Sequence, residues 1–551
     1  MASAPKLDLV ERASYISSST VGKTDGYNEV KTPETQDLEG GALRAGGTPN
    51  VWSRDYIGLL VNYATVGIVY GTLPSTVYPF YQNYLNMEGT QIVSAKVLLT
   101  LPWSFKVLYG ILTDCTTICG YRRRPFMLIG WSMCALMLLI MACSHVGKPY
   151  YMDRSLRHKP VSEYTTADWA TGINKAAPDA GSKFIVIMML AAVGYVGADV
   201  AADAVTVELA QREPESVRGT TQTTIYFVRT IFVAISYSIT GFLFNGKDYG
   251  GDFSYSLTFP QLMLTLTILT LPVLPATWFF IKEDKHPGVG FKLYITEFWE
   301  LLKSRAMYQV VAYRFISGIF ENMTQTVSSP VESNWVQATP LNDAIAAVIS
   351  QLVFAAVLFA TAKWGLQWNW RYMHIIALVS ATAIDAFTTM LTTWNIVRSQ
   401  WFWLGPPIVE NVPYAMGWMI QSFVMVELAG NGNEGAVYGL ITTVFNLSTS
   451  FSSTITKNID SHFDVTSADI KTDTHHVRLH VTYVYLICYG SKMLGLDPGA
   501  QGQGGKSKIM GGITVFYLIF ALCYTVMINI MSIYPSTKCL RIVGGTGCHK
   551  K

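Results

Sequence analysis

Apolar runs of about twenty residues recur along nearly the whole of this 551-residue chain. A run of that length crosses the hydrocarbon core of a bilayer as one helix, so repeated runs indicate a multi-span helical membrane protein. Charged residues make up 14% of the sequence, against about 25% in soluble domains. Lysines and arginines are not gathered into a nucleic-acid footprint. We therefore expect an all-α polytopic membrane protein that has the lipid bilayer as its surroundings and no nucleic-acid partner.

The apolar runs fall into two sets around a polar centre. Lys282 to Arg305 begins with charged residues and continues with apolar residues at helical spacing, which predicts an amphipathic helix at the cytosolic interface. About six spans precede it and about six follow, so we expect two six-helix bundles with twelve or thirteen spans. The expected divisions are a disordered cytosolic tail (1–53), an N-terminal bundle (54–281), the cytosolic linker (282–305), a C-terminal bundle (306–535) with an irregular region at 458–510, and a C-terminal tail (536–551).

The boundaries of the spans follow from the apolar runs, apart from one region near the C-terminus. Residues 458–480 are polar and soluble-looking, and the apolar run from Thr482 to Leu496 is short for a full crossing. The stretch from Pro498 to Lys508 is glycine-rich. The expected spans lie at about 56–80, 92–113, 126–144, 183–209, 220–244 and 259–281 in the first half, and at about 307–327, 342–362, 372–394, 403–428, 436–456 and 513–533 in the second.

The fourth run carries acidic residues where a bilayer would make them costly. Asp199, Asp203 and Glu208 lie in the segment Gly194–Glu208, whose other residues are mostly small and suit close helix packing. A carboxylate at the bilayer centre costs about 2.5–3.5 kcal/mol on insertion scales, so it usually faces a protein interior or a wet cavity. Asp199 and Asp203 share one helix face. Two interpretations remain: a structural pair tied to neighbouring helices, or a substrate or proton site inside a transporter.

The loop after the second span is strongly basic. Three consecutive arginines in a short loop orient it to the cytosol, although an aspartate beside arginines is, by itself, more often a solvated charge cluster. A glycine would let two helices approach closely, and an aspartate at a helix end can pair with the loop arginines. The residues that form this pattern are Gly110, Asp114, Gly120, Tyr121, Arg122, Arg123 and Arg124. Together they resemble the loop motif of the major facilitator superfamily, which implies a gating role. Glu208 falls near the cytosolic end of its span, close to Arg212 and Arg218, so we assign it to gating or to structure.

A narrower resemblance covers the chain from Trp52 to about Leu496. The segments PWSFKVLYGILTDCTTICGYRRRPFMLIGW and GADVAADAVTVELAQREPESVRGTTQT resemble the folate-biopterin transporter family within that superfamily. The resemblance implies a major facilitator-type transporter of folates or unconjugated pterins that needs no cofactor. The chain departs from the family after Leu496: a run that opens a full span in that family here breaks off at Gly495. Three alternatives remain: the helix expected at 513–533 replaces that span, it is an extra span, or a deletion in the gene model removed part of the chain.

The resemblance also implies which spans line a central cavity, namely the first, fourth, seventh and tenth. We hypothesise that Asp199 or Asp203 meets the pterin or a coupling proton, because a carboxylate can accept two N–H donors of the amino-pyrimidine edge. Arg229 or Arg314 would meet the carboxylates of a folate, although an internal ion pair between Arg314 and Glu321 is an equal alternative. The candidate substrate and proton residues are Asn62, Asp199, Asp203, Arg229, Arg314, Glu321, Asn322, Glu410 and Asn411.

Repulsion between neighbouring carboxylates favours a proton on one of them, so proton symport is the favoured coupling. Sodium coupling, exchange and facilitated diffusion stay open, as do transport of another small solute and a non-transporting receptor or scaffold. We find no nucleotide-binding glycine loop or nucleophile–base arrangement, so an enzyme is not expected. The eight cysteines show no metal-binding spacing, and we expect neither a disulfide framework nor a zinc site. Lack of a transit peptide favours the plasma membrane over an organelle.

Overall fold

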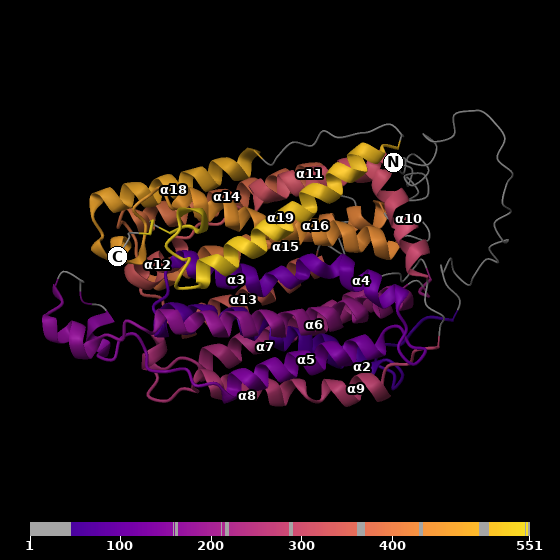
Figure 1. Ribbon diagram of the computed structural model, residues 1–551, viewed down its shortest axis with the longest axis horizontal. Coiled ribbons are helices and arrows are strands. Elements are labelled where there is room, and N and C mark those ends of the chain that lie inside the picture. Colours follow the sequence, from indigo (N-terminus) through magenta and orange to yellow (C-terminus); the bar gives the residue numbers. More distant parts are fainter. Residues whose placement is uncertain are drawn as a thin grey trace, which may run out of the picture.

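The computed structural model describes residues 46–157, 159, 163–210, 212–214, 220–285, 290–360, 370–428, 434–494, 506–545 and 547–548. Within these ranges the chain is helical, with a few isolated backbone bridges and no β-strand. The long helices run side by side along the long axis of the molecule (Figure 1). Most of the tail expected at 1–53 lies outside the described residues.

The first half of the chain contains six membrane-length helical segments at the expected places. Prolines explain the interruptions of these segments, because proline lacks the N–H that a continuous helix uses. Pro74 precedes a π-helical turn, Pro102 lies in a 3-10 turn, and Pro272 separates two helices. The segments are α2 (Ile57–Ser75) with the π-helix η3 (Val77–Tyr84); α3 (Gly89–Thr100), the 3-10 turn η4 (Leu101–Phe105) and α4 (Lys106–Cys115); α5 (Arg124–Cys143); α6 (Gly181–Ala210); α7 (Thr220–Leu243); and α8 (Phe259–Thr270) with α9 (Val273–Phe279).

Helices α5 and α6 approach each other at a pair of glycines. A Cβ atom at Gly130 would lie 2.5 Å from the carbonyl oxygen of Gly194, and one at Gly194 would lie 2.6 Å from the carbonyl oxygen of Gly130. Any side chain at either position would therefore push the helices apart. The close packing expected from the small residues around Gly194 is confirmed, and it fixes the helix that carries the acidic pair.

The second half begins after the amphipathic linker helix α10 (Phe291–Lys303), which forms where it was predicted. Its first span is broken: α11 ends at Glu321, and helical structure resumes at Ser328, after six intervening residues. The helices of this half are α11 (Arg305–Glu321), α12 (Ser328–Val331) with η11 (Glu332–Val336), α13 (Pro340–Ala360), α14 (Trp370–Thr393), α15 (Gln400–Leu428), α16 (Glu434–Asp460), α17 (Ser467–Thr472), α18 (His475–Leu494) and α19 (Lys508–Ile533).

The region expected to be irregular from residue 458 onward is more helical than predicted. Helix α16 continues to Asp460, and α18 begins at His475, so the short apolar run is the inner part of a 20-residue helix. The prediction was too short because His475, His476, Arg478 and His480 interrupt the apolar pattern at the exposed end of α18. The glycine-rich stretch after it falls largely outside the described residues.

Helix α19 is an additional long apolar helix that touches both halves of the molecule. It packs on α3 of the first half and on α16 of the second (Figure 1, yellow). Among the described residues, nine helical segments are long and apolar enough to cross a membrane, and α19 is one of them. Helices α11, α15, α16 and α18 fall outside that set, so the total of twelve or thirteen spans stays a prediction.

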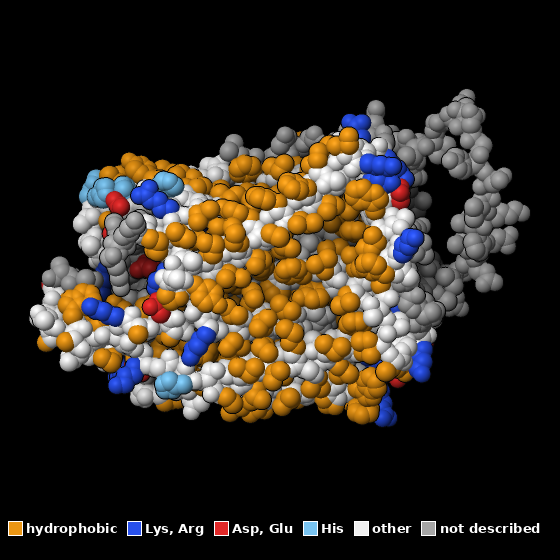
Figure 2. All heavy atoms as spheres, viewed as in Figure 1, with side chains coloured by type: hydrophobic (Ala, Val, Ile, Leu, Met, Phe, Trp, Pro, Cys, Tyr) orange, Lys and Arg blue, Asp and Glu red, His pale blue; other side chains and the backbone are white. Residues whose placement is uncertain are grey.

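On the face drawn in Figure 2, apolar side chains form a broad band across the middle of the molecule, and charged side chains lie mostly at its two ends. Exposed hydrophobic residues in this band include Phe516 and Phe520 on α19 and Ile268 on α8. Such a band matches the hydrocarbon layer of a bilayer. The two ends are therefore the two aqueous faces, one with the arginine-rich loop and α10, the other with the C-terminal segment.

The C-terminal segment contains a disulfide bond between Cys539 and Cys548, which corrects the expectation that the cysteines form none. Helix α19 starts beside α10, where Lys506 meets Glu300, and ends where Lys538 meets Asp179 just before α6. The disulfide is therefore at the end opposite the arginine-rich loop. Disulfides persist in oxidising compartments, and this position agrees with a cytosolic location for the arginines.

Candidate functional site

The two buried acids of α6 face a lysine from the broken second span. Lys106 Nζ lies 2.8 Å from Asp203 Oδ2 and 3.2 Å from Asp199 Oδ2. The side chain of Asp199 is fully buried, and those of Lys106 and Asp203 are 11% and 16% exposed. The predicted shared face of Asp199 and Asp203 is confirmed, and Lys106 compensates their negative charge at the middle of the bundle.

The break in the second span is what positions Lys106. Pro102 tightens the chain into η4, and Lys106 is the first residue of α4 after that turn. The Nζ atom of Lys106 also lies 4.6 Å from the centre of the Trp103 ring, within the range of a cation–π interaction. The local sequence Pro-Trp-Ser-Phe-Lys thus places one cation between an aromatic face and two carboxylates.

Tyr63 of α2 holds the far side of the acidic pair. Its hydroxyl donates to Asp203 Oδ1 at 2.5 Å and lies 3.2 Å from the Thr206 hydroxyl. Both oxygens of Asp203 are therefore engaged. Asp199 differs, because within the described parts of the chain its buried Oδ1 has no hydrogen-bond partner. A buried acceptor that lacks a partner requires a physical explanation, and one explanation is a proton or a ligand.

Arg229 of α7 adds a second cation beside aromatic rings. Its guanidinium carbon lies 5.0 Å from the centre of the Tyr70 ring and 5.1 Å from that of Trp103. The guanidinium is attracted mainly to Asp199 among the nearby carboxylates. Trp103 in turn donates from its ring nitrogen to the hydroxyl of Tyr195, at 3.2 Å. Two acids, two bases and an aromatic wall therefore meet at one place in the N-terminal bundle.

The same break contacts the C-terminal bundle. The backbone N–H of Val107 donates to Thr443 Oγ1 at 3.0 Å, and the carbonyl of Trp103 accepts a bond from Asn446 Nδ2 at 3.3 Å. Both partners belong to α16. Backbone groups freed by the break are thus satisfied by the other bundle, one residue after Lys106 and three residues before it. A movement of α16 would therefore displace the backbone that carries Lys106.

A second charged network lies at the end of the molecule that bears the arginine-rich loop. Arg123 is buried, with Nη2 2.5 Å from Asp114 Oδ1 and 3.6 Å from Glu208 Oε1, and Nη1 donates to Thr113 Oγ1 at 2.7 Å. Arg122 Nη2 lies 3.4 Å from the same Glu208 oxygen. The structure therefore brings together the aspartate, the arginines and the glutamate that the sequence analysis assigned to gating.

Glu283, which follows α9, completes this network. Its carboxylate accepts the backbone N–H groups of Arg122, Arg123 and Arg124 at 2.7, 2.8 and 2.9 Å. A carboxylate at a helix N-terminus is stabilised by the unpaired N–H groups there. Glu283 thus fixes the start of α5 to the end of the sixth span.

The linker helix joins the network through Tyr294, whose hydroxyl donates to Asp114 Oδ2 at 3.3 Å. Burial, followed by the negative charge of Asp114, raises the pKa of Tyr294 and keeps it a donor. The bond connects α4 to α10, the segment that links the two bundles. Movement of the linker therefore acts on the same residues as the arginine loop.

The two glycines assigned to gating differ. Gly120 has a positive φ of 84° in the turn that joins Ile118 to Tyr121, a conformation that favours glycine. At Gly110, by contrast, a Cβ atom would meet nothing within 4 Å. The expectation that Gly110 permits a close helix contact is therefore wrong as far as the described residues go, because none of their helices lies against it.

Three candidates of the seventh span, two on α11 and one at its C-terminal cap, lie apart from the acidic pair. Arg314 is attracted electrostatically to Glu321, in line with the internal ion pair that was one of the two alternatives. Asn322 caps α11 and donates to the carbonyl of Gly318 at 2.8 Å. These residues form a separate polar group in the C-terminal bundle.

The remaining candidates are also outside the cluster. Glu410 of α15 interacts electrostatically with Asp385 of α14 and Lys492 of α18. Asn411 donates to the carbonyl of Pro407 at 2.7 Å. Asn62 is buried among helices: its amide donates to Thr277 Oγ1 at 2.9 Å and accepts from Trp131 Nε1 at 2.7 Å. The hydrogen bonds of Asn62 link α2, α5 and α9 and direct it away from the acids.

Sequence reasoning missed three contributors. Lys106 was visible as a lysine inside an apolar run, and Tyr63 as a polar residue in a predicted cavity-lining span. Glu283 carried no local signal, because its role depends on the contact between the end of α9 and the start of α5. In each case the partner is far away in the sequence.

The fold is that of the major facilitator transporters, as three solved structures show. The D-xylose–proton symporter is 13% identical and matches 88% of this chain and 98% of its own, with a TM-score of 0.50. The xylose transporter XylE from E. coli in a partially occluded inward-open conformation is 12% identical over 80% and 95%, with a TM-score of 0.52. The nucleoside transporter NupG is 11% identical over 80% and 99%, with a TM-score of 0.51. These likenesses support the fold alone.

The particular family follows from the sequence. The BT1 family model matches residues 67–154 and 169–486, which is more than half of the chain, and the protein therefore belongs to the BT1 family. A curated relative, the folate-biopterin transporter of Synechocystis sp., is 20% identical over 406 residues, which cover 72% of this chain and 73% of the relative. Family and fold are those of multi-pass membrane transporters, which are not enzymes.

Proposed function

We propose that this transporter moves folates or unconjugated pterins across a membrane by alternating access, with the cluster of Lys106, Asp199, Asp203 and Arg229 as its substrate and proton site. The name of the Synechocystis relative supports the substrate class. The observation that carries the proposal is the fully buried Asp199 carboxylate, with Lys106 on one oxygen and no described hydrogen-bond partner on the other. A structural ion pair would satisfy both oxygens.

The chemistry of the cluster suits a pterin. The amino-pyrimidine edge presents adjacent N–H donors, which Asp199 can accept once Lys106 turns fully to Asp203. The flat bicycle would stack on the aromatic wall formed by Tyr70, Trp103 and Tyr195. The guanidinium of Arg229 has the planar shape that binds carboxylates in a bidentate manner. It would receive the glutamate tail of a folate.

Lys106 also supplies a route for proton coupling. Both carboxylates form an ion pair with its single ammonium group. If one carboxylate is protonated, Lys106 pairs with the other one alone. Proton binding also makes the net charge of the cluster one unit more positive, which favours a substrate carboxylate beside Arg229, so that proton and substrate would be carried in the same direction. We therefore propose proton coupling in preference to sodium coupling, because the cluster has an ammonium group where a sodium site would have further oxygen ligands.

Two sets of contacts would transmit the conformational change. On one side, α16 holds the backbone of the broken second span through Thr443 and Asn446. On the other, Asp114, Arg123 and Glu208 close the cytosolic end, and Tyr294 ties them to the linker helix. Breaking the second set would open the cytosolic side, while the first passes movement of the C-terminal bundle to Lys106.

Uptake of labelled folate and labelled biopterin in a transport-deficient host, at two external pH values, tests the proposal. We expect accumulation of at least one of them, faster at the more acidic external pH. Good surface expression without uptake of either would reject the substrate class and favour another small organic solute. Uptake that does not respond to pH would reject proton coupling. Localisation of the tagged protein would decide between the plasma membrane, which we favour, and an organelle.

A further inference from the structure

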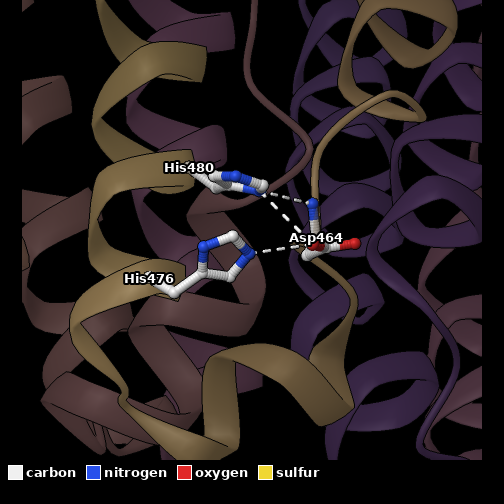
Figure 3. A group of neighbouring side chains, drawn as sticks. All are labelled: Asp464, His476 and His480. Carbon is white, nitrogen blue, oxygen red and sulfur yellow. Dashed lines mark hydrogen bonds and ion pairs between the residues drawn. The ribbon is translucent and has the colours of Figure 1, made fainter.

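Three side chains of kinds that commonly bind metals lie together between the end of α16 and the first turns of α18. His476 and His480 lie one turn apart on α18, and Asp464 belongs to the segment between α16 and α17. Figure 3 shows both imidazoles extending from α18 towards the Asp464 carboxylate. Within the described ranges, this is the one place where three or more His, Cys, Asp or Glu donors come together in this way.

The distances fit a single ion. Asp464 Oδ2 lies 3.0 Å from His476 Nε2 and 3.7 Å from His480 Nδ1, and the three ligand atoms are all within 4.8 Å of one another. Zinc bonds to histidine nitrogen are about 2.0–2.1 Å long, so two ligands of a tetrahedral zinc lie roughly 3.3–3.5 Å apart. Small side-chain rotations would therefore bring the three donors onto one ion.

The backbone already holds the donors in place. The N–H of Asp464 donates to His480 Nδ1 at 2.9 Å, and the ring of Phe463 packs on that of His480 with 5.8 Å between their centres. Thr466 caps α17 and fixes the chain two residues further on. Little conformational freedom would thus be lost when an ion binds, and a preorganised site binds more tightly.

Binding changes two hydrogen bonds and leaves the charges of the ligands unaltered. An ionised Asp464 only accepts, so the proton between it and His476 belongs to Nε2. When an ion takes Nε2, that proton moves through water to Nδ1 of the same imidazole. The N–H of Asp464 gives up His480 Nδ1 and turns to water, which is available because Asp464 is 66% exposed.

The donor set selects the kind of ion. Two imidazoles with one carboxylate suit zinc, copper or nickel, whereas magnesium and calcium prefer oxygen ligands only. The cation nearest in sequence, Arg478, is on another face of α18 and forms an ion pair with Asp473. Exposure of His476 to solvent, at 62%, leaves room for water as a fourth ligand.

We propose that Asp464, His476 and His480 bind a divalent transition metal, zinc above all, at the end of the molecule opposite the arginine-rich loop. The ion would tie the segment after α16 to α18, within the C-terminal bundle and away from the charged cluster around Lys106. The expectation of no zinc site considered cysteine spacing only. The histidine pair one helical turn apart was the sequence signal that it did not use.

Zinc titration of the purified full chain tests the proposal. The chain carries an affinity tag without histidine, is stripped with EDTA, and competes for zinc with a chromophoric chelator. We expect one bound zinc per chain that excess magnesium and calcium do not displace. His476→Ala, His480→Ala and Asp464→Asn should each weaken zinc binding at least about 100-fold, the upper end of the range for loss of a group that only supports a ligand.

His475→Ala is the matched control, because that ring lies beside Trp394, with 5.5 Å between ring centres, and not in the cluster. It should bind zinc as the wild type does. Cobalt, used as a spectroscopic substitute, should give visible absorption in the wild type and in His475→Ala but not in the triple variant. Zinc should raise the melting temperature of the same two proteins only. Absence of bound zinc in the wild type, or equal affinity in the triple variant, would overturn the proposal.

Discussion

The two bundles treat their charged residues differently. In the N-terminal bundle, Lys106, Asp199, Asp203 and Arg229 come from three helices and form one buried cluster. In the C-terminal bundle, the candidate charges are divided between Arg314 with Glu321 on α11 and Glu410 near α14 and α18. The helix of the second half that meets the cluster, α16, contributes hydroxyl and amide groups there. Where α16 meets the cluster, the N-terminal bundle thus supplies the charges and the C-terminal bundle supplies neutral polar partners.

This difference suggests a division of labour. A buried charge cluster is costly unless its members are paired, so it persists where function requires it. Neutral hydrogen bonds across the bundle contact are weaker and can break and form again as the bundles move. We infer that chemistry is located in the N-terminal bundle, and that the C-terminal bundle moves against it.

The largest expected effect comes from removing the shared cation. Lys106→Met removes the ammonium group that both acids share and leaves only the more distant charge of Arg229 to offset Asp199 and Asp203. Breaking a buried ion pair costs about 3–5 kcal/mol. We expect uptake to fall at least about 100-fold and the melting temperature to drop. The measurements are initial uptake rate per transporter at the surface and thermal unfolding of the purified protein.

The double variant Lys106→Met with Asp203→Asn separates structure from function. It removes one positive and one negative charge, so stability should return while uptake stays absent. Glu410→Gln is the matched acid of the C-terminal bundle and should retain most uptake. If Glu410→Gln were as damaging as Lys106→Met, the contrast between the bundles would be lost.

The next largest effect concerns the cytosolic network. Glu283→Gln keeps the shape of the side chain but weakens its bonds to the backbone of Arg122, Arg123 and Arg124. Hydrogen bonds to a charged group contribute about 1.5–3 kcal/mol, so we expect uptake to fall about tenfold. Arg314→Gln, in the C-terminal bundle, should have a smaller effect. Accessibility of an introduced cytosolic cysteine to a membrane-impermeant thiol reagent should increase in Glu283→Gln only.

A smaller effect is expected where three helices from different parts of the chain meet. Lys457 of α16 is fully buried and donates at 2.7 Å to both Ser94 of α3 and Asn529 of α19. Lys457→Met fills the same space without a buried charge, so stability should be unchanged or higher. Uptake should fall, but by less than in Glu283→Gln, because the polar link between the bundles is lost. A large loss of stability would show that the lysine is structurally essential.

The smallest effect on transport is expected at the outer end of the C-terminal bundle. Asp473 has a positive φ of 51°, which asparagine also tolerates, so Asp473→Asn is a mild change. Although burial opposes it, hydrogen bonds from Arg398 and Arg478 lower the pKa of Asp473. A native pKa below the unfolded value of about 3.9 stabilises the protein above that pH, and the stabilisation is lost as the pH falls through the native pKa.

Asp473→Asn should therefore melt at a lower temperature than the wild type at pH 7, and the difference should shrink as the pH falls below about 4, the unfolded value. Uptake should be unchanged. Thermal unfolding followed by tryptophan fluorescence at several pH values checks this. A difference in melting temperature that grows towards low pH would contradict the assignment of the ion pair.

How much was predictable depended on whether the partner was near in sequence. The apolar runs predicted most helices to within a few residues, and the spacing of Asp199 and Asp203 predicted their common face. The length of α18 was not predictable from its apolar run, because its exposed end is rich in histidine. Contacts between distant segments, such as Lys106 with the acids of α6 or Glu283 with the start of α5, required the packed structure.

The central claim is that Asp199 is the residue at which substrate and proton meet. Asp199→Asn, reconstituted in liposomes with an imposed pH gradient, tests it most directly when compared with the wild type and Glu410→Gln. The account predicts that labelled pterin or folate accumulates in response to the gradient with the wild type and Glu410→Gln, but not with Asp199→Asn, at equal reconstituted amounts. Accumulation by Asp199→Asn at the wild-type rate would contradict the account.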